Sequence, residues 1–161
     1  MRPADALRWI RIAGIIGVLV ALCGCAKLPP TSAVTIPPIP PGLARVWFYR
    51  EDLPYVVRQR PYVRMNGAVV GISEDGGAFY RDVPPGQYYV TVDSYGTDIN
   101  QFPYIALVPG QTAYLQVLGS RYWESGGRRR DWERPTFYVW LMPNDVGSPA
   151  VARSPFYPNA S

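Results

Sequence analysis

The most reactive side chains in this sequence are two cysteines, Cys23 and Cys25, because the 161-residue chain contains no histidine. Without an imidazole, Ser–His and Cys–His nucleophile pairs and histidine-ligated metal sites are excluded. Both cysteines lie near the N-terminus, directly after an apolar run. The reactive side chains therefore point to chemistry at the start of the chain.

Acidic residues offer the next chemistry, and two adjacent pairs occur, Glu51-Asp52 and Glu74-Asp75. Adjacent side chains of an extended chain point apart, whereas a glycosidase needs two carboxyl groups about 5–10 Å apart across a cleft. No Asp-x-Asp-x-Asp spacing of a calcium loop occurs. We therefore expect no catalytic residues, no metal ligands and a protein that is not an enzyme.

One dense positive run, Arg128, Arg129 and Arg130, lies between Trp123 and Trp132. Guanidinium groups bind phosphates and carboxylates in a two-pronged manner, and indole rings pack on sugars and at lipid boundaries. These five residues are thus candidate contacts for an anionic polymer or a protein partner. The alternative is an exposed hairpin tip whose charge is balanced by neighbouring acids.

The first 24 residues have the organisation of a secretory signal. Arg2, Arg8 and Arg11 precede an uncharged, mainly apolar run from Ile12 to Ala26. That run is shorter than the roughly 20 residues of a membrane-spanning helix. We expect a cleaved signal helix over residues 1–24.

The segment Leu22-Cys23-Gly24-Cys25 resembles the lipobox of bacterial lipoproteins. The resemblance implies cleavage between Gly24 and Cys25 and an acyl-bearing diacylglyceryl group on Cys25, with no other cofactor. Because Ala26 follows, it also implies the periplasmic face of the outer membrane rather than the inner one. That compartment argues against a nucleic-acid partner. An ordinary cleaved signal or an uncleaved anchor is the alternative.

Proline-rich segments flank the central part of the chain. Residues 25–43 are expected to form a disordered, extended tether, which at about 3.1 Å per residue would span on the order of 50 Å. Residues 144–161 contain three prolines among small and polar residues, and they are expected to form a flexible tail. One domain, over residues 44–143, remains between them.

That domain shows the two-residue periodicity of β-strands. The dipeptide Asn66-Gly67 predicts a type I′ hairpin, because both residues tolerate a positive φ. A two-residue loop would pair Met65 with Ala68, Arg64 with Val69 and Val63 with Val70. Strands are expected over residues 44–50, 61–65, 68–72, 78–83, 88–95, 104–108, 112–118 and 136–141.

Seven or eight strands at such spacing predict an all-β chain folded as a single β-sandwich. A hydrophobic content of 48% supports a packed core. Several tyrosines exceed what one core holds, which predicts an aromatic outer sheet face for interaction or ordinary cross-strand packing. They are Tyr49, Tyr55, Tyr62, Tyr89 and Tyr95.

The order of motifs after the lipobox resembles the bacterial lipoprotein domain of unknown function 2846. The motifs are Ala44–Arg50, Asn66-Gly67, the element Val83-x-Pro85-Gly86-x-Tyr88-x-Val90, and Pro109–Tyr114. The third also resembles PEGA-type and transthyretin-like domains, which implies a Greek-key sandwich.

The features together predict a lipid-anchored periplasmic binding or structural module of the cell envelope. The membrane and an envelope protein or anionic envelope polymer would be its partners. Two other functions stay open: a carboxylate- or Ser-based envelope hydrolase or transferase, and a subunit of a secretion or surface assembly.

Overall fold

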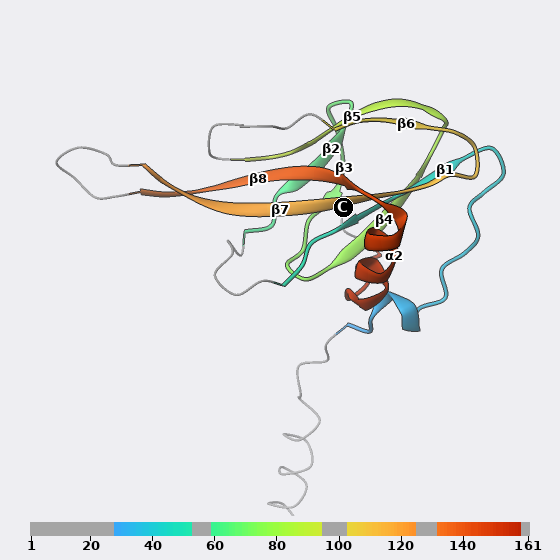
Figure 1. Cartoon of the computed structure of the whole chain (residues 1–161), viewed down its shortest axis with the longest axis horizontal. Helices are drawn as coiled ribbons and strands as arrows, with labels where there is room; N and C mark the ends of the chain where they lie inside the picture. The colour runs from blue at the N-terminus through green and yellow to red at the C-terminus, as the bar shows by residue number, and fades with distance from the viewer. Residues whose placement is uncertain (1–27, 53–58, 95–102, 125–131, 159–161) are drawn as a thin grey trace, which may run out of the picture.

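The computed structural model describes residues 28–52, 59–94, 103–124 and 132–158, with backbone alone at 121–124 and 132–135. Its described residues form mostly β-structure, arranged as two four-stranded sheets (Figure 1). Sheet 1 has the order β4-β1-β7-β8 and sheet 2 the order β3-β2-β5-β6. The strands are β1 (Ala44–Tyr49), β2 (Tyr62–Met65), β3 (Ala68–Ile72), β4 (Ala78–Val83), β5 (Gly86–Val92), β6 (Tyr104–Leu107), β7 (Thr112–Glu124) and β8 (Trp132–Met142).

All strand pairs are antiparallel except β1 and β7, which run parallel. Side chains that alternate along each strand meet between the sheets and form the main core. Within it, the rings of Phe48 and Phe79 stack with centroids 5.0 Å apart. The two packed sheets confirm a mostly β, sandwich-like fold, although the structure also contains a helix that was not predicted from the sequence. The other core residues include Val46, Val63, Met65, Val90, Val92, Ile105, Leu107, Leu115, Val117, Phe137 and Val139.

The hairpin between β2 and β3 turns at Asn66 and Gly67, with φ of 49° and 83°, as predicted for a type I′ turn. Met65 lies opposite Ala68 and Arg64 opposite Val69, also as predicted. The third predicted pair is wrong, because the register shifts and Val63 lies opposite Gly71. A bulge of this kind adds one residue to one strand and turns the following side chains to the other face.

The β7–β8 hairpin is longer than the sequence predicted. The ladder continues from Tyr114 opposite Met142 to Glu124 opposite Trp132, and Figure 1 shows it extending beyond the other strands. The apolar alternation ends near Leu118, so the predicted strands were shorter than β7 and β8. Because β8 is the edge strand of sheet 1, Pro135, which lacks an N–H, is tolerated there.

The prediction of a flexible tail is wrong, because residues Asn144–Arg153 form the helix α2. Asp145 lies in its first turn and Arg153 in its last turn, where each charge complements the helix dipole. Pro149 lies inside the helix and weakens it locally. Packing of Gly147, Ala150 and Val151 against sheet 1 offsets that loss, as is usual for short helices.

The expectation of a disordered tether is also wrong for residues 28–43, which we call the N-terminal strap. It contains a short 3₁₀ helix, η1 (Thr31–Ala33), and lies along the domain beside α2 (Figure 1). Proline-rich chain has unpaired acceptors and few donors, so it can be held by donors from a neighbouring element. The part of the signal and tether over residues 1–27 lies outside the described residues.

The end of the chain pairs with the first residue of β4, and the strap pairs with the end of the chain. The amide of Ala78 donates to Pro155 (2.9 Å), and the amide of Phe156 donates to Pro29 (3.1 Å). The backbone N–H and C=O of Ala78 are therefore paired and are not free to bond to another chain at the edge of the sheet. Within the described residues, no helix has the length and apolarity required to traverse a membrane.

Candidate functional site

Only some of the predicted site residues belong to the part of the chain that the structure describes. Gly24, Cys25 and the run Arg128–Arg130 lie outside the described residues. Trp123 and Trp132 belong to β7 and β8, where they lie opposite Glu133 and Glu124. The ladder therefore brings the two tryptophan positions to the same far end of the β7–β8 hairpin.

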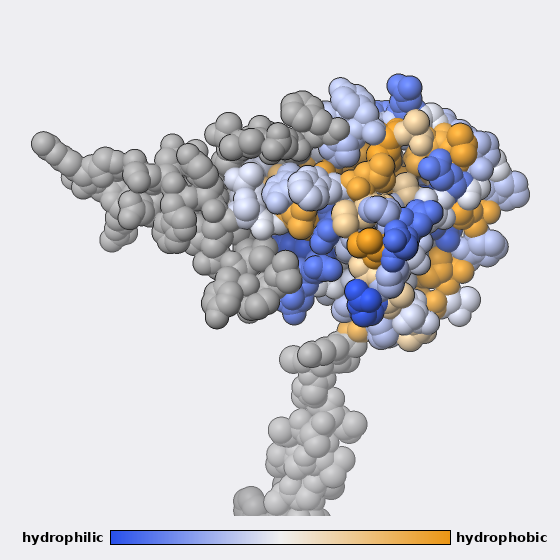
Figure 2. Space-filling view, viewed as in Figure 1, coloured by the Kyte–Doolittle hydropathy of each residue, from blue (hydrophilic) through white to orange (hydrophobic). Residues whose placement is uncertain are grey.

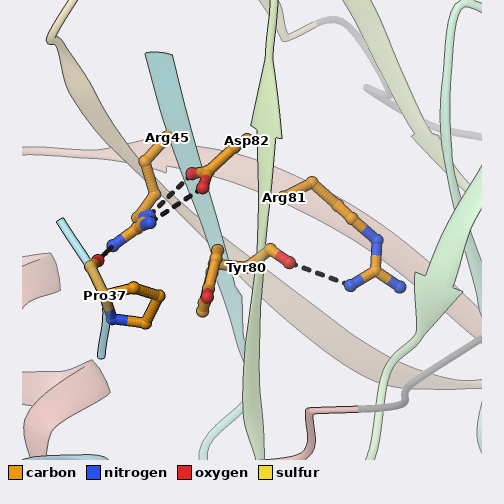
Figure 3. Close-up of polar contacts among 5 residues, drawn as sticks. All are labelled: Pro37, Arg45, Tyr80, Arg81 and Asp82. Carbon is orange, nitrogen blue, oxygen red and sulfur yellow. Dashed lines mark hydrogen bonds and ion pairs between the residues drawn. The ribbon is translucent and has the colours of Figure 1, made fainter. Parts of the chain in front are cut away.

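The clearest polar centre lies on the outer face of sheet 1 and was missed from sequence (Figure 3). Arg45 of β1 lies directly opposite Asp82 of β4. Its Nε donates to Asp82 Oδ1 (2.7 Å), and its Nη2 donates to Asp82 Oδ2 (2.8 Å). The remaining nitrogen, Nη1, donates to the carbonyl oxygen of Pro37 in the strap (2.7 Å).

Arg45 is almost completely buried, with 5% of its surface exposed. Its guanidinium carbon lies 4.1 Å from the centroid of the Tyr80 ring, which adds a cation–π contact. The hydrogen bonds to Asp82 raise the pKa of Arg45 above its ordinary value, although burial opposes them. This centre joins β1, β4 and the strap, so its role is to hold the strap on the sheet.

Aromatic rings around this centre form a second core on the same face. Trp47 lies 5.0 Å from Tyr80 and 6.0 Å from Phe156, measured between ring centroids. Tyr49 is buried in the same cluster together with Ala150 and Val151 of α2. Burial raises the pKa of Tyr49 above its ordinary value. Over β4, β1 and the start of β7, the outer face of sheet 1 is therefore covered by α2, the strap and the end of the chain, whereas Trp140 of β8 is 53% exposed.

The outer face of sheet 2 carries a different set of side chains, which we call the tyrosine face. Tyr62 is 47% exposed and Tyr104 is 71% exposed. The ring of Tyr104 lies 4.9 Å from that of Tyr89, its cross-strand partner. The face consists of Tyr62, Arg64, Val69, Tyr89, Asp93 and Tyr104.

A charged pair lies within the tyrosine face. Arg64 Nε donates to Asp93 Oδ1 (2.7 Å), and Arg64 Nη2 donates to Asp93 Oδ2 (3.0 Å). The hydrogen bonds to Asp93 raise the pKa of Arg64. Both groups are partly exposed, so they remain accessible to a ligand.

The tyrosines predicted for an aromatic outer sheet face lie in different environments. Tyr62 is exposed and Tyr89 is half-buried on sheet 2, whereas Tyr49 is buried under α2. Tyr55 and Tyr95 lie outside the described residues. In the view of Figure 2, apolar and hydrophilic residues are interspersed over the described part of the surface.

Two further arginines extend into apolar surroundings. Arg50 is 1% exposed; its Nη1 donates to the carbonyl of Gln59 (2.7 Å), and its Nη2 lies 3.6 Å from Asp75 Oδ1. Arg81 points to the other side of β4 from Asp82 (Figure 3) and donates to the carbonyl of Tyr80 (2.9 Å). Burial lowers the pKa of Arg50 and of Arg81.

The acids that the structure pairs each face an arginine rather than another acid. The pairs are Asp82 with Arg45, Asp75 with Arg50, Glu74 with Arg60 and Asp93 with Arg64. Over the described ranges, no group of three His, Cys, Asp or Glu side chains is placed to hold a metal ion. The predicted turn acids Glu74 and Asp75 are therefore partners of arginines from neighbouring segments.

The sequence contains one signal for the polar centre formed by Arg45, Asp82 and Pro37. Arg45 and Asp82 are charged residues within strands that are rich in aromatic and apolar residues. Such a charge needs a partner if its side of the strand is buried, but the sequence does not say which segment covers that side.

No family model, curated protein or solved structure matches this chain. The resemblance to the domain of unknown function 2846 therefore stays a prediction.

Proposed function

We propose that the protein is a lipid-anchored binding module of the bacterial cell envelope that performs no catalysis. An acyl-bearing group on Cys25 would hold it at the membrane, facing the periplasm, with the outer membrane as the preferred location. The tyrosine face would contact an envelope protein or an anionic envelope polymer.

The exposed aromatic and apolar side chains of sheet 2 carry this proposal. On sheet 1, α2, the strap and Phe156 cover the outer face over β1 and β4, although Trp140 on the edge strand β8 is exposed. On sheet 2, Tyr62, Val69 and Tyr104 are exposed on three different strands. Exposed apolar and aromatic side chains that gather on one face are typical of interaction surfaces. Tyrosine suits such a surface, since its ring is apolar and its hydroxyl is polar.

One feature of the strand order supports assignment to the Greek-key, transthyretin-like sandwiches. After the β2–β3 hairpin, β4 returns to lie beside β1. In a Greek key the fourth strand likewise returns to lie beside the first. Such sandwiches support many unrelated functions, so the functional argument depends on the face and not on the fold.

Acylation is tested with Cys25→Ala in the full-length chain. The variant should incorporate no labelled palmitate and should leave the membrane fraction or stay uncleaved. Palmitate in the variant would contradict a lipid on Cys25. Cys23→Ala is the matched control, since it should retain both the label and the location.

Binding is tested with a photo-reactive amino acid at Tyr104 on the tyrosine face. The control position is Ser148, which is exposed on α2. We expect adducts from position 104 only, and their loss when Tyr62→Ser is added. Equal adducts from both positions, or none from position 104, would contradict binding by this face. An adduct with a small substrate together with its turnover would favour the hydrolase or transferase instead.

A further inference from the structure

Because the strap is bonded to the domain, the free chain between the proposed lipid and the domain is shorter than the sequence predicted. Thr31 donates to the carbonyl of Ser154 through its amide (2.8 Å) and through its hydroxyl (2.9 Å). Phe156 donates to Pro29 (3.1 Å), so the chain is attached from Pro29 onward. Arg45 holds it again at Pro37.

Only three peptide steps separate Cys25 from Leu28, the first described residue. A fully extended chain covers at most about 3.3–3.6 Å per residue, so the sulfur-bearing residue lies within about 10 Å of the strap. The spacer of roughly 50 Å expected for a disordered tether is thereby reduced to a short link.

The strap also determines from which side the link leaves. Its first residues pair with the end of the chain, and α2 packs on β1 and β7 of sheet 1. In Figure 1 the start of the strap, with η1, and α2 lie at the bottom of the described molecule, while β5 and β6 of sheet 2 lie at the top; the rest of the strap runs up the right side to β1. Because packed sheets are about 10 Å apart and a helix layer adds about 10 Å, the outer face of sheet 2 lies well away from α2.

The strap side has chemistry that suits a lipid headgroup surface. Leu28 is 43% exposed beside the point where the chain enters the fold. Arg153 is exposed in the last turn of α2, next to Ser154, to which the strap is bonded. A cation beside an apolar side chain can contact anionic headgroups and the boundary of the acyl chains.

We infer that the strap holds the acylated protein in one orientation, with the strap and α2 against the bilayer surface and the tyrosine face directed away from it. This inference rests on the proposed lipid at Cys25. Its partner is the lipid headgroup surface itself. The consequence is that the tyrosine face is presented to the periplasm, where a second envelope component can reach it.

The orientation is tested by fluorescence quenching of the full-length, processed protein in phosphatidylethanolamine–phosphatidylglycerol vesicles with a nitroxide on the lipid headgroup. Cys23 leaves with the proposed signal and Cys25 is acylated, so one added cysteine gives one label. Ser32→Cys reports the strap side and Gln87→Cys reports sheet 2; both positions are exposed. We expect several-fold stronger quenching at position 32 than at position 87.

A lengthened link provides the matched control. About twelve Gly and Ser residues inserted between Lys27 and Leu28 add a flexible chain of about 20 Å. The insertion leaves every described contact of the strap in place, and it should bring the two labels to similar quenching.

The outcomes separate this inference from the proposed function. Palmitate incorporation is measured on the same samples. Equal quenching at the two positions in acylated protein with the native link would overturn the orientation and leave the proposed function intact. Absence of palmitate would overturn both.

Discussion

Arg45 and Asp82 lie directly opposite one another on β1 and β4 and form a two-pronged ion pair of 2.7 and 2.8 Å. The third nitrogen of the same guanidinium holds the carbonyl of Pro37. One buried side chain therefore connects two strands of a sheet to a proline-rich segment that has few donors of its own. The strap depends on this pair for its position along the sheet.

Asp82→Asn should destabilise the protein by roughly 2–4 kcal/mol at pH 7, because it leaves the buried guanidinium of Arg45 without its counter-charge. The free energy of unfolding in urea measures the loss. Asp145→Asn, an exposed acid of α2, is the control and should stay within about 0.5 kcal/mol. Equal stability of the two variants would contradict the role of the pair.

Gly147→Ala should destabilise the protein by about 1–3 kcal/mol and release α2 from sheet 1. A β-carbon at this position would overlap the β-carbon of Tyr114, which cannot move away without its strand. Thermal unfolding and proteolysis of the C-terminal segment measure the effect. Ser148→Ala, on the exposed side of the same helix, should be neutral. If Gly147→Ala were equally neutral, the close packing of α2 would be wrong.

The stability of the fold should fall as the pH rises above about 10, partly because of Tyr49. Burial raises the pKa of its hydroxyl in the folded state, whereas the unfolded value is about 10. The unfolded chain then loses its proton first, so stability present below pH 10 is lost as the pH rises through the folded pKa.

Tyr49→Phe should make that alkaline decline shallower, as followed by urea unfolding at several pH values. Tyr104→Phe removes a tyrosine hydroxyl from the exposed face of sheet 2 and should leave the decline unchanged. An identical slope for Tyr49→Phe and the parent protein would show that Tyr49 does not contribute.

Replacing Arg128, Arg129 and Arg130 together with Ser should change the free energy of unfolding by no more than about 0.5 kcal/mol per residue. The three residues connect β7 and β8, and the sequence predicts an exposed tip there. Urea unfolding compared with the parent protein measures the change. Loss of the soluble fold would show that the run is structural.

Local patterns predicted much of the β-sheet core. Two-residue periodicity predicted a strand at the position of each strand from β1 to β8, and Asn66-Gly67 located the first hairpin with two of its three pairs correct. These features depend on neighbouring residues of one strand or turn, so a sequence pattern contains them. The bulge at the third pair does not follow from alternation, since alternation assumes that no residue is inserted.

Residues 28–43 and 144–153 are the segments whose structure the local sequence pattern did not predict. Proline, glycine and small residues in both segments indicate weak intrinsic structure, so disorder was predicted there, whereas the structure shows η1 and α2. Their order comes from contacts between segments far apart in sequence, such as Thr31 with Ser154 and Arg45 with Pro37.

The sequence by itself thus determined that strands form and where the first hairpin turns, and its segment ending at Cys25 resembles a lipobox. The three-dimensional packing decided that α2, the strap and the end of the chain cover the outer face of sheet 1 over β1 and β4. A long-range contact of this kind is favourable only after the sheet has assembled and brought its partners together. Its residue pairs are therefore visible in the folded molecule and in no window of the sequence.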